Sequence, residues 1–288
     1  MNRDNGVKLG QRRKPYKRKT AFTTIIMIFF IALICTAVII GALFISGIRL
    51  IKEETLDGDY IKFFGRTEDG APYSGTVYYP NGLTAKLNKG ENKLIYSDGS
   101  VYTGEIKNLL RDGEGEMKYS NGDIYTGTFD SDVITGSGKF VFSNGDSYEG
   151  ELVSGLKSGY GTYTWADGSY YTGLFKDDQR NGAGFSHWAD GSSYDGTYVN
   201  GVKSGNGTFT FSNGDIYTGE YVEDQRSGYG TYNWANGESY TGNFKDNTLN
   251  GEGTYTWASG RTYTGIFENG KMVATEEGAE TEDVSDLQ

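Results

Sequence analysis

The feature that most constrains this chain is a Tyr-x-Gly triplet that returns every 23 residues, eight times in succession. A fixed period of this length is typical of proteins that stack one small supersecondary unit many times. We number the repeat from its Tyr as position 0, so the Gly occupies position 2. The repeat-defining pairs are Tyr102 and Gly104, Tyr125 and Gly127, Tyr148 and Gly150, Tyr171 and Gly173, Tyr194 and Gly196, Tyr217 and Gly219, Tyr240 and Gly242, and Tyr263 and Gly265.

Two short segments of each repeat alternate between large and polar residues. Positions 0 and 4 are large, and residues 161–165 at positions 13–17 read Gly-Thr-Tyr-Thr-Trp. A period of two is the pattern of a strand with one buried face. A Gly at position 20, usually preceded by Asn or Asp, signals a tight turn. Each repeat is therefore predicted to be a two-stranded hairpin, and stacked repeats should bury a continuous strip that no single hairpin could bury.

Glycine composition supports the same fold class. Of the 44 Gly residues, 30 fall at positions 2, 11, 13 and 20 of the repeat. So much Gly argues against a helical bundle, where each interior Gly costs about 1 kcal/mol relative to Ala. We predict an all-β fold, an elongated solenoid or twisted antiparallel sheet of stacked hairpins. The Gly at position 2 should leave room on the aromatic face for rings from neighbouring strands.

The repeat pattern sets the expected organisation of the chain. It is strong over residues 100–270 and persists in worn form over 58–99, which we interpret as degenerate capping repeats. Residues 271–288 carry six acidic side chains and one Lys with little apolar content, so a disordered acidic tail is expected. The single Cys, Cys35, excludes an intramolecular disulfide.

An apolar segment near the N-terminus predicts a membrane anchor. No charged residue occurs from Thr20 to Ile48, which is long enough to cross about 30 Å of hydrocarbon. A transmembrane signal-anchor helix is therefore expected over 21–48, followed by a juxtamembrane linker over 49–57. The alternative, a cleaved signal peptide, usually has a shorter apolar region that ends in small residues.

The charge distribution predicts the orientation of that anchor. The first 50 residues hold nine basic residues and one acidic residue, whereas residues 51–270 hold 17 basic and 31 acidic ones. Because basic flanks stay in the cytoplasm, residues 1–20 are expected to be cytoplasmic and the repeats to lie outside the cell membrane. A large domain without disulfides is common among bacterial surface proteins.

The repeat unit resembles a known family. Tyr-Thr-Gly-x-Phe followed by Gly-x-Gly-x-x-x-Trp-x-Asp/Asn-Gly is similar to the MORN (membrane occupation and recognition nexus) repeat, strongly over 100–270 and weakly over 58–99. The resemblance implies an elongated sheet of stacked hairpins that serves as a scaffold or a protein-interaction module. Lipid kinase and methyltransferase domains accompany the repeats in some relatives, but no stretch outside the repeats here is long enough for either.

One row of basic residues is the candidate interaction site. Position 9 is basic in five repeats, and equal positions stack, so these side chains should form a row able to bind phosphate or carboxylate groups. The alternative is a solvated row paired with acids that neighbour it in sequence, such as Asp178 and Asp224. The row consists of Arg111, Lys157, Arg180, Lys203 and Arg226, with Ile134 and Leu249 as exceptions.

Other chemistry is weakly indicated. The single His, His187, alternates onto the polar face, where neighbouring Ser and Asp residues cannot complete a catalytic triad. The Gly-x-Gly segments lack the helix and the Lys of a nucleotide loop, and the Asn-Gly-Asp turns lack the period of a calcium-binding roll. We therefore expect no catalytic residue, no metal site and no cofactor.

The aromatic residues leave two functions open. Four Trp at position 17, Trp165, Trp188, Trp234 and Trp257, could be buried by stacking or could form an exposed ladder that binds glycans. Our interpretation is a membrane-anchored, non-catalytic scaffold with an unknown protein partner. The alternative is a cell-envelope module that binds a glycan or an anionic polymer. The exposed end hairpin at 263–267 could pair with a second copy. The acidic body disfavours nucleic acid and phosphoinositides.

Overall fold

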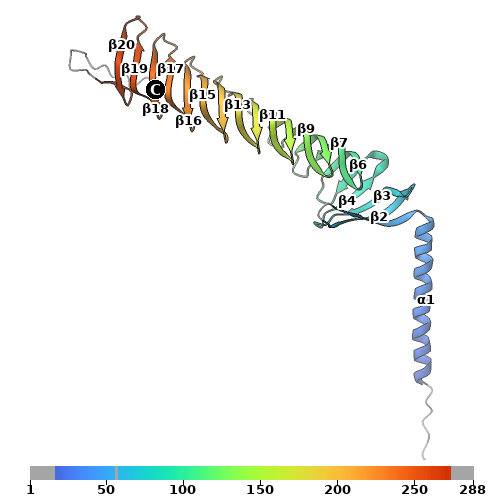
Figure 1. Ribbon diagram of the computed structural model, residues 1–288. Coiled ribbons are helices and arrows are strands. Elements are labelled where there is room, and N and C mark those ends of the chain that lie inside the picture. The colour runs from blue at the N-terminus through green and yellow to red at the C-terminus, as the bar shows by residue number, and fades with distance from the viewer. Residues whose placement is uncertain (1–16, 56–57, 274–288) are drawn as a thin grey trace, which may run out of the picture.

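The computed structural model describes residues 17–55 and 58–273, with side chains from residue 24 onward. One helix, α1 (Lys17–Ile45), leads into a row of strands that form a single open antiparallel sheet, drawn out into a long rod (Figure 1). Each strand pairs with the next strand along the chain, from β1 to β21. The expected all-β repeat fold is thereby confirmed.

The strands of the first part of the sheet are β1 (Ile48–Glu54), β2 (Tyr60–Glu68), β3 (Ala71–Tyr78), β4 (Thr84–Asn88) and β5 (Lys93–Tyr96), with a 3-10 turn η1 (Lys89–Glu91) before β5. The regular repeats supply β6 (Val101–Lys107), β7 (Leu110–Lys118), β8 (Ile124–Asp130), β9 (Val133–Val141), β10 (Ser147–Val153), β11 (Leu156–Thr164), β12 (Tyr170–Lys176), β13 (Gln179–His187), β14 (Ser193–Val199), β15 (Val202–Thr210), β16 (Ile216–Val222), β17 (Gln225–Asn233), β18 (Ser239–Lys245), β19 (Thr248–Thr256), β20 (Thr262–Glu268) and β21 (Lys271–Met272).

The sheet extends further toward both ends than the sequence suggests. A linker was expected over 49–57, but β1 begins at Ile48 and pairs with β2 along its whole length. At the other end, Lys271 and Met272 form β21 rather than part of a disordered tail. Residues 274–288 of that tail and the first 16 residues lie outside the described residues. In residues 58–99 Phe63 lies over the facing glycines Gly65 and Gly75, as the repeat tyrosines do over theirs.

In each of the seven repeats from Tyr102 to Tyr240, the tyrosine at position 0 lies flat over two facing glycines. The Gly at position 2 pairs across the strands with the Gly at position 13, as Gly196 does with Gly207. A Cβ added to either glycine would overlap the ring of Tyr194. The ring that fills this space therefore belongs to the same strand, two residues earlier, and not to a neighbouring strand as we had expected. Seven of these tyrosines donate a hydrogen bond from the hydroxyl to the carbonyl oxygen at position 3.

The residue at position 4 links one repeat to the next. Tyr198 meets the ring of Tyr194 in its own repeat edge-to-face, with centroids 5.3 Å apart, and that of Tyr171 in the preceding repeat at the same distance. Aromatic pairs in this geometry contribute roughly 0.5–1.5 kcal/mol beyond the area they bury. Because the contact recurs along the rod, the position 0 tyrosines from Tyr102 to Tyr240 are fully buried in a sheet only one layer thick.

Two kinds of turn connect the strands. The turn at position 20 was expected from its Gly. The second turn, at positions 6 and 7, has left-handed backbone at both residues, as at Glu223 and Asp224, with φ of 48° and 67°. Two such residues define the tight type I′ hairpin turn. This turn could not be predicted from Gly, because several copies have none there.

The turns on both long sides of the sheet carry hydrogen bonds between successive repeats. At one edge the amide of Asp224 donates to the carbonyl of Lys203 at 3.0 Å, while the Asp224 carboxylate accepts from the Lys203 amide at 2.8 Å. At the other edge the Asp215 carboxylate accepts from the Ala235 amide at 2.8 Å and from the Tyr232 hydroxyl at 2.7 Å. Polar turn residues therefore bind the repeats together.

The glycine pair gives a direct test of the packing. Gly207→Ala should lower the free energy of unfolding by about 1–3 kcal/mol, because the new methyl group has no room beside the Tyr194 ring. Asn206→Ala, on the adjacent residue and the exposed face, is the matched control and should change it by less than about 0.5 kcal/mol. Thermal unfolding of the full chain in detergent measures both, and equal losses for the two variants would contradict this account.

Acid should weaken the carboxylate hydrogen bonds that connect successive repeats. Burial raises the pKa of Asp215, but the hydrogen bonds from Ala235, Tyr232 and Asn213 outweigh it and hold the pKa below its ordinary value. A carboxyl whose pKa is lowered by folding stabilises the fold above its unfolded pKa, about 3.9, and loses this contribution as the pH falls further. The unfolding temperature should therefore drop below about pH 4. Asp215→Asn should reduce the size of that drop, and an unchanged pH profile would refute the role.

Candidate functional site

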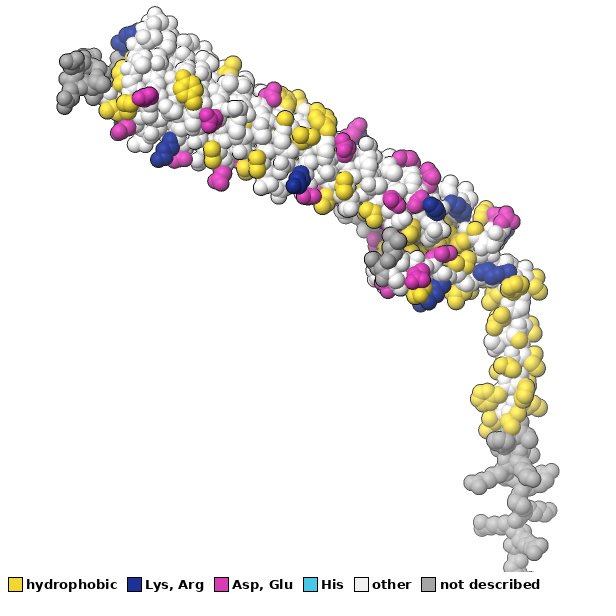
Figure 2. All heavy atoms as spheres, viewed as in Figure 1, with side chains coloured by type: hydrophobic (Ala, Val, Ile, Leu, Met, Phe, Trp, Pro, Cys, Tyr) yellow, Lys and Arg dark blue, Asp and Glu magenta, His cyan; other side chains and the backbone are white. Residues whose placement is uncertain are grey.

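The aromatic face of the sheet also carries the basic row of position 9, and we call the strip of this face along the row the groove. Position 9 pairs across the hairpin with the aromatic position 4, as Lys203 does with Tyr198. The five basic side chains therefore do not stand out from the rod. They lie along the groove with their stems over aromatic rings, half-buried. In the view of Figure 2, the charged side chains on the rod are more often acidic than basic.

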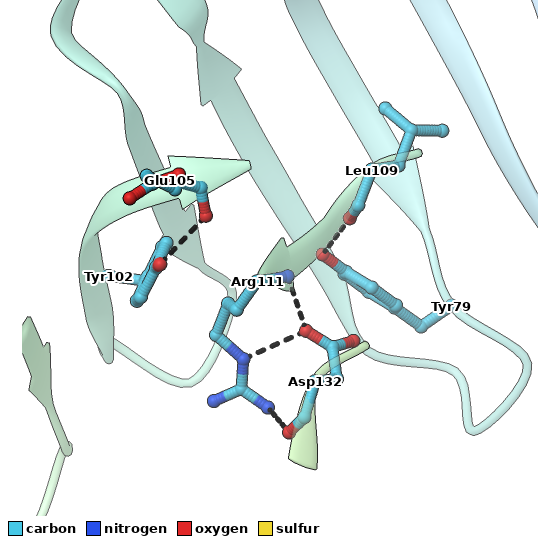
Figure 3. A network of polar contacts seen from close by, with 6 residues as sticks. All are labelled: Tyr79, Tyr102, Glu105, Leu109, Arg111 and Asp132. Atoms are coloured by element: carbon cyan, nitrogen blue, oxygen red, sulfur yellow. Dashed lines mark hydrogen bonds and ion pairs between the residues drawn. The ribbon is translucent and has the colours of Figure 1, made fainter. Parts of the chain in front are cut away.

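The first member of the row shows how a cation is held (Figure 3). The Arg111 backbone amide and Nε both donate to Asp132 Oδ1, at 2.8 and 2.9 Å, and Nη2 donates to the Asp132 carbonyl at 2.9 Å. The guanidinium also lies over the Phe129 ring, 5.0 Å from its centroid. Asp132 belongs to the tight turn of the next repeat, so this ion pair joins two repeats.

The same arrangement recurs 21 residues apart, which differs from the pairing we expected. Asp178 is a sequence neighbour of Arg180, yet it forms its ion pair with Lys157 of the preceding repeat, at 3.1 Å. The second residue of the left-handed turn, where it is Asp132 or Asp178, therefore pairs with the cation of the preceding repeat. Arg180 and Arg226 face a glycine and an asparagine at the equivalent places, and each donates from Nη2 to a backbone carbonyl, that of Gly201 and that of Asn247.

Three consecutive cations in the groove thus differ from the first two. Among the residues that the structure describes, Arg111 and Lys157 have a carboxylate within ion-pair distance, whereas Arg180, Lys203 and Arg226 have none. Lys203 shows this most clearly, because the Asp224 carboxylate accepts from its backbone amide and is not within ion-pair distance of its ammonium. The result is a row of three cations on the aromatic face with no carboxylate within ion-pair distance among the described residues.

The Lys203 ammonium makes cation–π contacts with four aromatic side chains. Its Nζ lies 4.9–6.0 Å from the centroids of four aromatic side chains. Burial lowers the pKa of Lys203, with Asp224 opposing the shift and the charges of Arg180 and Arg226 adding to it. Cation–π contacts stabilise such an ammonium, but they satisfy none of its N–H donors. An anion placed here would find donors ready. The four rings are Trp188, Tyr194, Phe209 and Tyr221.

The four tryptophans at position 17 border this groove as half-buried side chains. They do not form a ladder with one another. Trp165 packs on Tyr163 at 4.9 Å, and Trp234 on Tyr232 at 4.6 Å, so each ring lies in a file that alternates with position 15. Trp188 and Trp257 pack in the same way on Phe209 and Tyr255. This packing does not favour an exposed ladder of the kind that glycan binding needs.

The file of rings is interrupted at one place. Position 15 is Met or aromatic in the other repeats but Ser186 in the fourth, and its hydroxyl lies 2.6 Å from that of Tyr198. A pocket of about 360 Å³ lies on the same face, and its lining includes Trp165, Phe175, Lys157 and Arg180. The sequence does contain a signal for this gap, which is a Ser at a position where the other repeats have Met or an aromatic residue.

The remaining candidates have structural surroundings. His187 lies on the outer face against the Tyr170 ring, with centroids 5.4 Å apart. Asp123 and Asp146, from the Asn-Gly-Asp turns, accept amide hydrogen bonds from Ser143 and Ala166 of the next repeats. No cluster of three metal-binding side chains occurs within residues 17–55 and 58–273.

Solved structures with a related outline are distant. The TCP10 domain of Danio rerio CPAP, in complex with a STIL peptide, is 14% identical, covers 75% of this chain and 93% of its own, and has a TM-score of 0.42. The SAS-4 TCP domain of Drosophila melanogaster, in complex with a proline-rich motif of Ana2, is 16% identical, with coverages of 55% and 86% and a TM-score of 0.35. Likenesses at this level support no inference about function.

Sequence comparison is more decisive. No curated protein sequence matches the chain. The MORN repeat model, however, matches seven consecutive segments. They are residues 102–124, 125–147, 148–170, 171–193, 194–216, 217–239 and 240–260. The matched segments abut without a gap, cover more than half of the chain and begin at the position 0 tyrosines that lie over the glycine pairs. This chain therefore belongs to the MORN repeat family.

Proposed function

We propose that this chain is a single-pass membrane protein whose MORN rod is a non-catalytic scaffold that binds a partner protein along its groove. The observation that carries the proposal is α1. Its span Thr24–Ile45 is long and apolar enough to cross a bilayer, and none of it is buried against the sheet. Figure 2 shows apolar side chains along its described length. So large an exposed apolar surface is unfavourable in water and needs lipid around it.

The charges favour one orientation. Basic residues before the span and the acidic rod after it support a cytoplasmic N-terminus and an extracytoplasmic rod. An acidic body is repelled by an anionic lipid surface, so we assign membrane attachment to the span rather than to the repeats. Because only two residues separate α1 from β1, the rod is coupled closely to its anchor.

The groove supports the binding role. MORN repeats are protein- and membrane-interaction modules, and this groove combines aromatic rings with three cations that lack carboxylate partners. Aromatic and Arg side chains are enriched where proteins bind one another. Repeats that each add the same row of groups provide an extended surface rather than a single active cleft.

Topology provides the first test. Protease added to intact cells should remove the rod while an N-terminal tag stays protected, because the rod is expected outside the membrane. Lysed cells serve as the control in which both are cleaved. Protection of the rod in intact cells would reverse the orientation. Loss of the tag from the mature protein would show that the segment is a cleaved signal.

Crosslinking tests the scaffold role. A photo-crosslinker in place of Gln179, which lines the groove pocket, should trap a partner protein in the native membrane. The same group in place of Asn206, on the exposed outer face, is the matched control and should trap much less. Equal capture at both sites, or none at Gln179, would contradict binding in the groove.

A further inference from the structure

The sheet begins almost at the end of the proposed membrane span, and Figure 1 shows its first strands directly beside the end of α1. The Gly47 carbonyl, between α1 and β1, accepts hydrogen bonds from the Thr67 amide and hydroxyl, both at 2.9 Å. The Arg49 guanidinium donates to the Phe44 carbonyl at 2.8 Å. The junction is therefore structured, and it holds β1–β5 beside the bilayer surface at which α1 would end.

Strands β1–β5 bury one face and expose the other. The buried face contributes Phe63, Val77 and Leu94 to the core. We call the opposite face, formed by the outward side chains of β1–β5, the basal face. It precedes residues 102–260, which the MORN model matches. Its cross-strand rows are Leu50, Phe64, Thr76, Lys86 and Ile95, then Lys52, Lys62, Tyr78 and Thr84, and then Arg66, Ser74, Asn88 and Lys93.

The basal face carries five basic residues that have no carboxylate within ion-pair distance among the described residues. Glu54 and Glu68 lie at strand ends of this face, and neither pairs with these cations. By contrast, Lys118 on β7 forms an ion pair with Glu116 at 2.9 Å. In the view of Figure 2, basic side chains are more frequent beside α1 than along the rest of the rod. The five are Lys52, Lys62, Arg66, Lys86 and Lys93.

Two of these cations face each other. Lys52 on β1 pairs directly across the strands with Lys62 on β2. Like charges placed directly opposite destabilise a sheet. The Lys52 ammonium lies 3.2 Å from the Tyr60 ring centroid, a cation–π contact that accepts none of its N–H bonds. An anion beside the basal face would offset the repulsion and accept those hydrogen bonds.

Exposed apolar side chains lie between the cations. Leu50 is 73% exposed and pairs across the strands with Phe64, which is also exposed. Along β2 the side chains of this face are Lys62, Phe64 and Arg66 in succession. Basic groups interleaved with apolar and aromatic ones suit a membrane interface, where charged headgroups lie above acyl chains. The other exposed apolar side chains of the face are Tyr60, Tyr78 and Ile95.

We propose that the basal face docks on anionic lipid headgroups of the leaflet at which α1 ends. The inference rests on the membrane span of the proposed function and adds a second contact with the lipid. The reach is short, because the five residues from Ile45 to Leu50 extend at most about 17 Å. The acidic repeats that follow are repelled by the same headgroups, so only the base of the rod lies on the membrane.

Fluorescence quenching by lipid tests the docking in the full chain, reconstituted into vesicles. Ile95→Cys in a Cys35→Ala background places one labelled cysteine on β5, roughly 19 Å across the sheet from β1. Quenching by a spin label on phosphatidylcholine headgroups should be about threefold greater in vesicles that contain phosphatidylglycerol than in pure phosphatidylcholine. About 1 M salt should abolish this gain, because the contacts are ionic. A gain that persists in salt, or no gain at all, would overturn the proposal.

A second label position reports whether the contact is confined to the base. The same fluorophore at Asn206→Cys, on the exposed outer face of the rod, should show no gain in either lipid. A gain at Asn206 equal to that at Ile95 would place the whole rod on the membrane and contradict docking by the basal face alone.

Charge reversal assigns the contact to named residues. Lys62→Glu with Lys86→Glu should remove the gain at Ile95, because the face then repels anionic lipid. Lys176→Glu with Lys245→Glu, on exposed residues of the rod, changes the net charge equally and should preserve the gain. Loss of the gain in both double variants, or in neither, would refute the assignment.

The two proposals can fail separately. A chain that resists extraction by alkaline carbonate but shows no gain at Ile95 would refute the docking and leave the membrane span in place. Extraction by carbonate would refute the span and the docking that rests on it. A gain at Ile95 with no partner captured at Gln179 would support the docking and refute the partner site in the groove.

Discussion

The contact on which the rest of the rod depends is a tyrosine ring lying flat over two facing glycines. Because neither glycine has a Cβ, the ring fits close to the backbone and its hydroxyl reaches the carbonyl at position 3. Because the ring lies close to the backbone, the position 4 side chain can pack edge-to-face against it and against the tyrosine of the preceding repeat. A single-layer sheet, which has no second layer to cover its apolar face, thereby buries a core of its own.

Much of this could be predicted from the sequence because the contact needs fixed residue types at fixed intervals. The glycines at positions 2 and 13 and the tyrosine at position 0 recur without exception in the matched repeats, so period, strand pattern and fold class follow. The tight turn at positions 6 and 7 was missed, since pairs such as Asn108-Leu109 carry no Gly although both residues are left-handed. The strand at Ile48–Glu54 was missed because its partner β2 lies in a region where the period is lost.

The site was only partly predictable. Equal repeat positions do stack, so the row from Arg111 to Arg226 exists, but its pairing follows the turns rather than the sequence neighbours. Asp178 lies two residues from Arg180 and serves Lys157 instead, because the tight turn directs it toward the preceding repeat. The residue 21 positions ahead is an Asp that pairs with the Lys157 ammonium and a Gly in the case of Arg180, but for Lys203 it is Asp224, whose carboxylate accepts from the backbone amide and not from the ammonium. The membrane span, the orientation and the division into segments remain predictions.

The hydrogen bonds between turns, on the two long sides of the sheet, join each repeat only to the repeats directly before and after it. Each added unit of 23 residues would lengthen the rod by about 10 Å without altering the joints already made. Gene duplication or loss of whole units is then a way to adjust, in even steps, how far from its anchor the rod can hold what it carries. Insertion of a few residues would shift the turns on both sides of the sheet out of their hydrogen bonds with the next repeat. The length of such a rod therefore evolves by whole repeats.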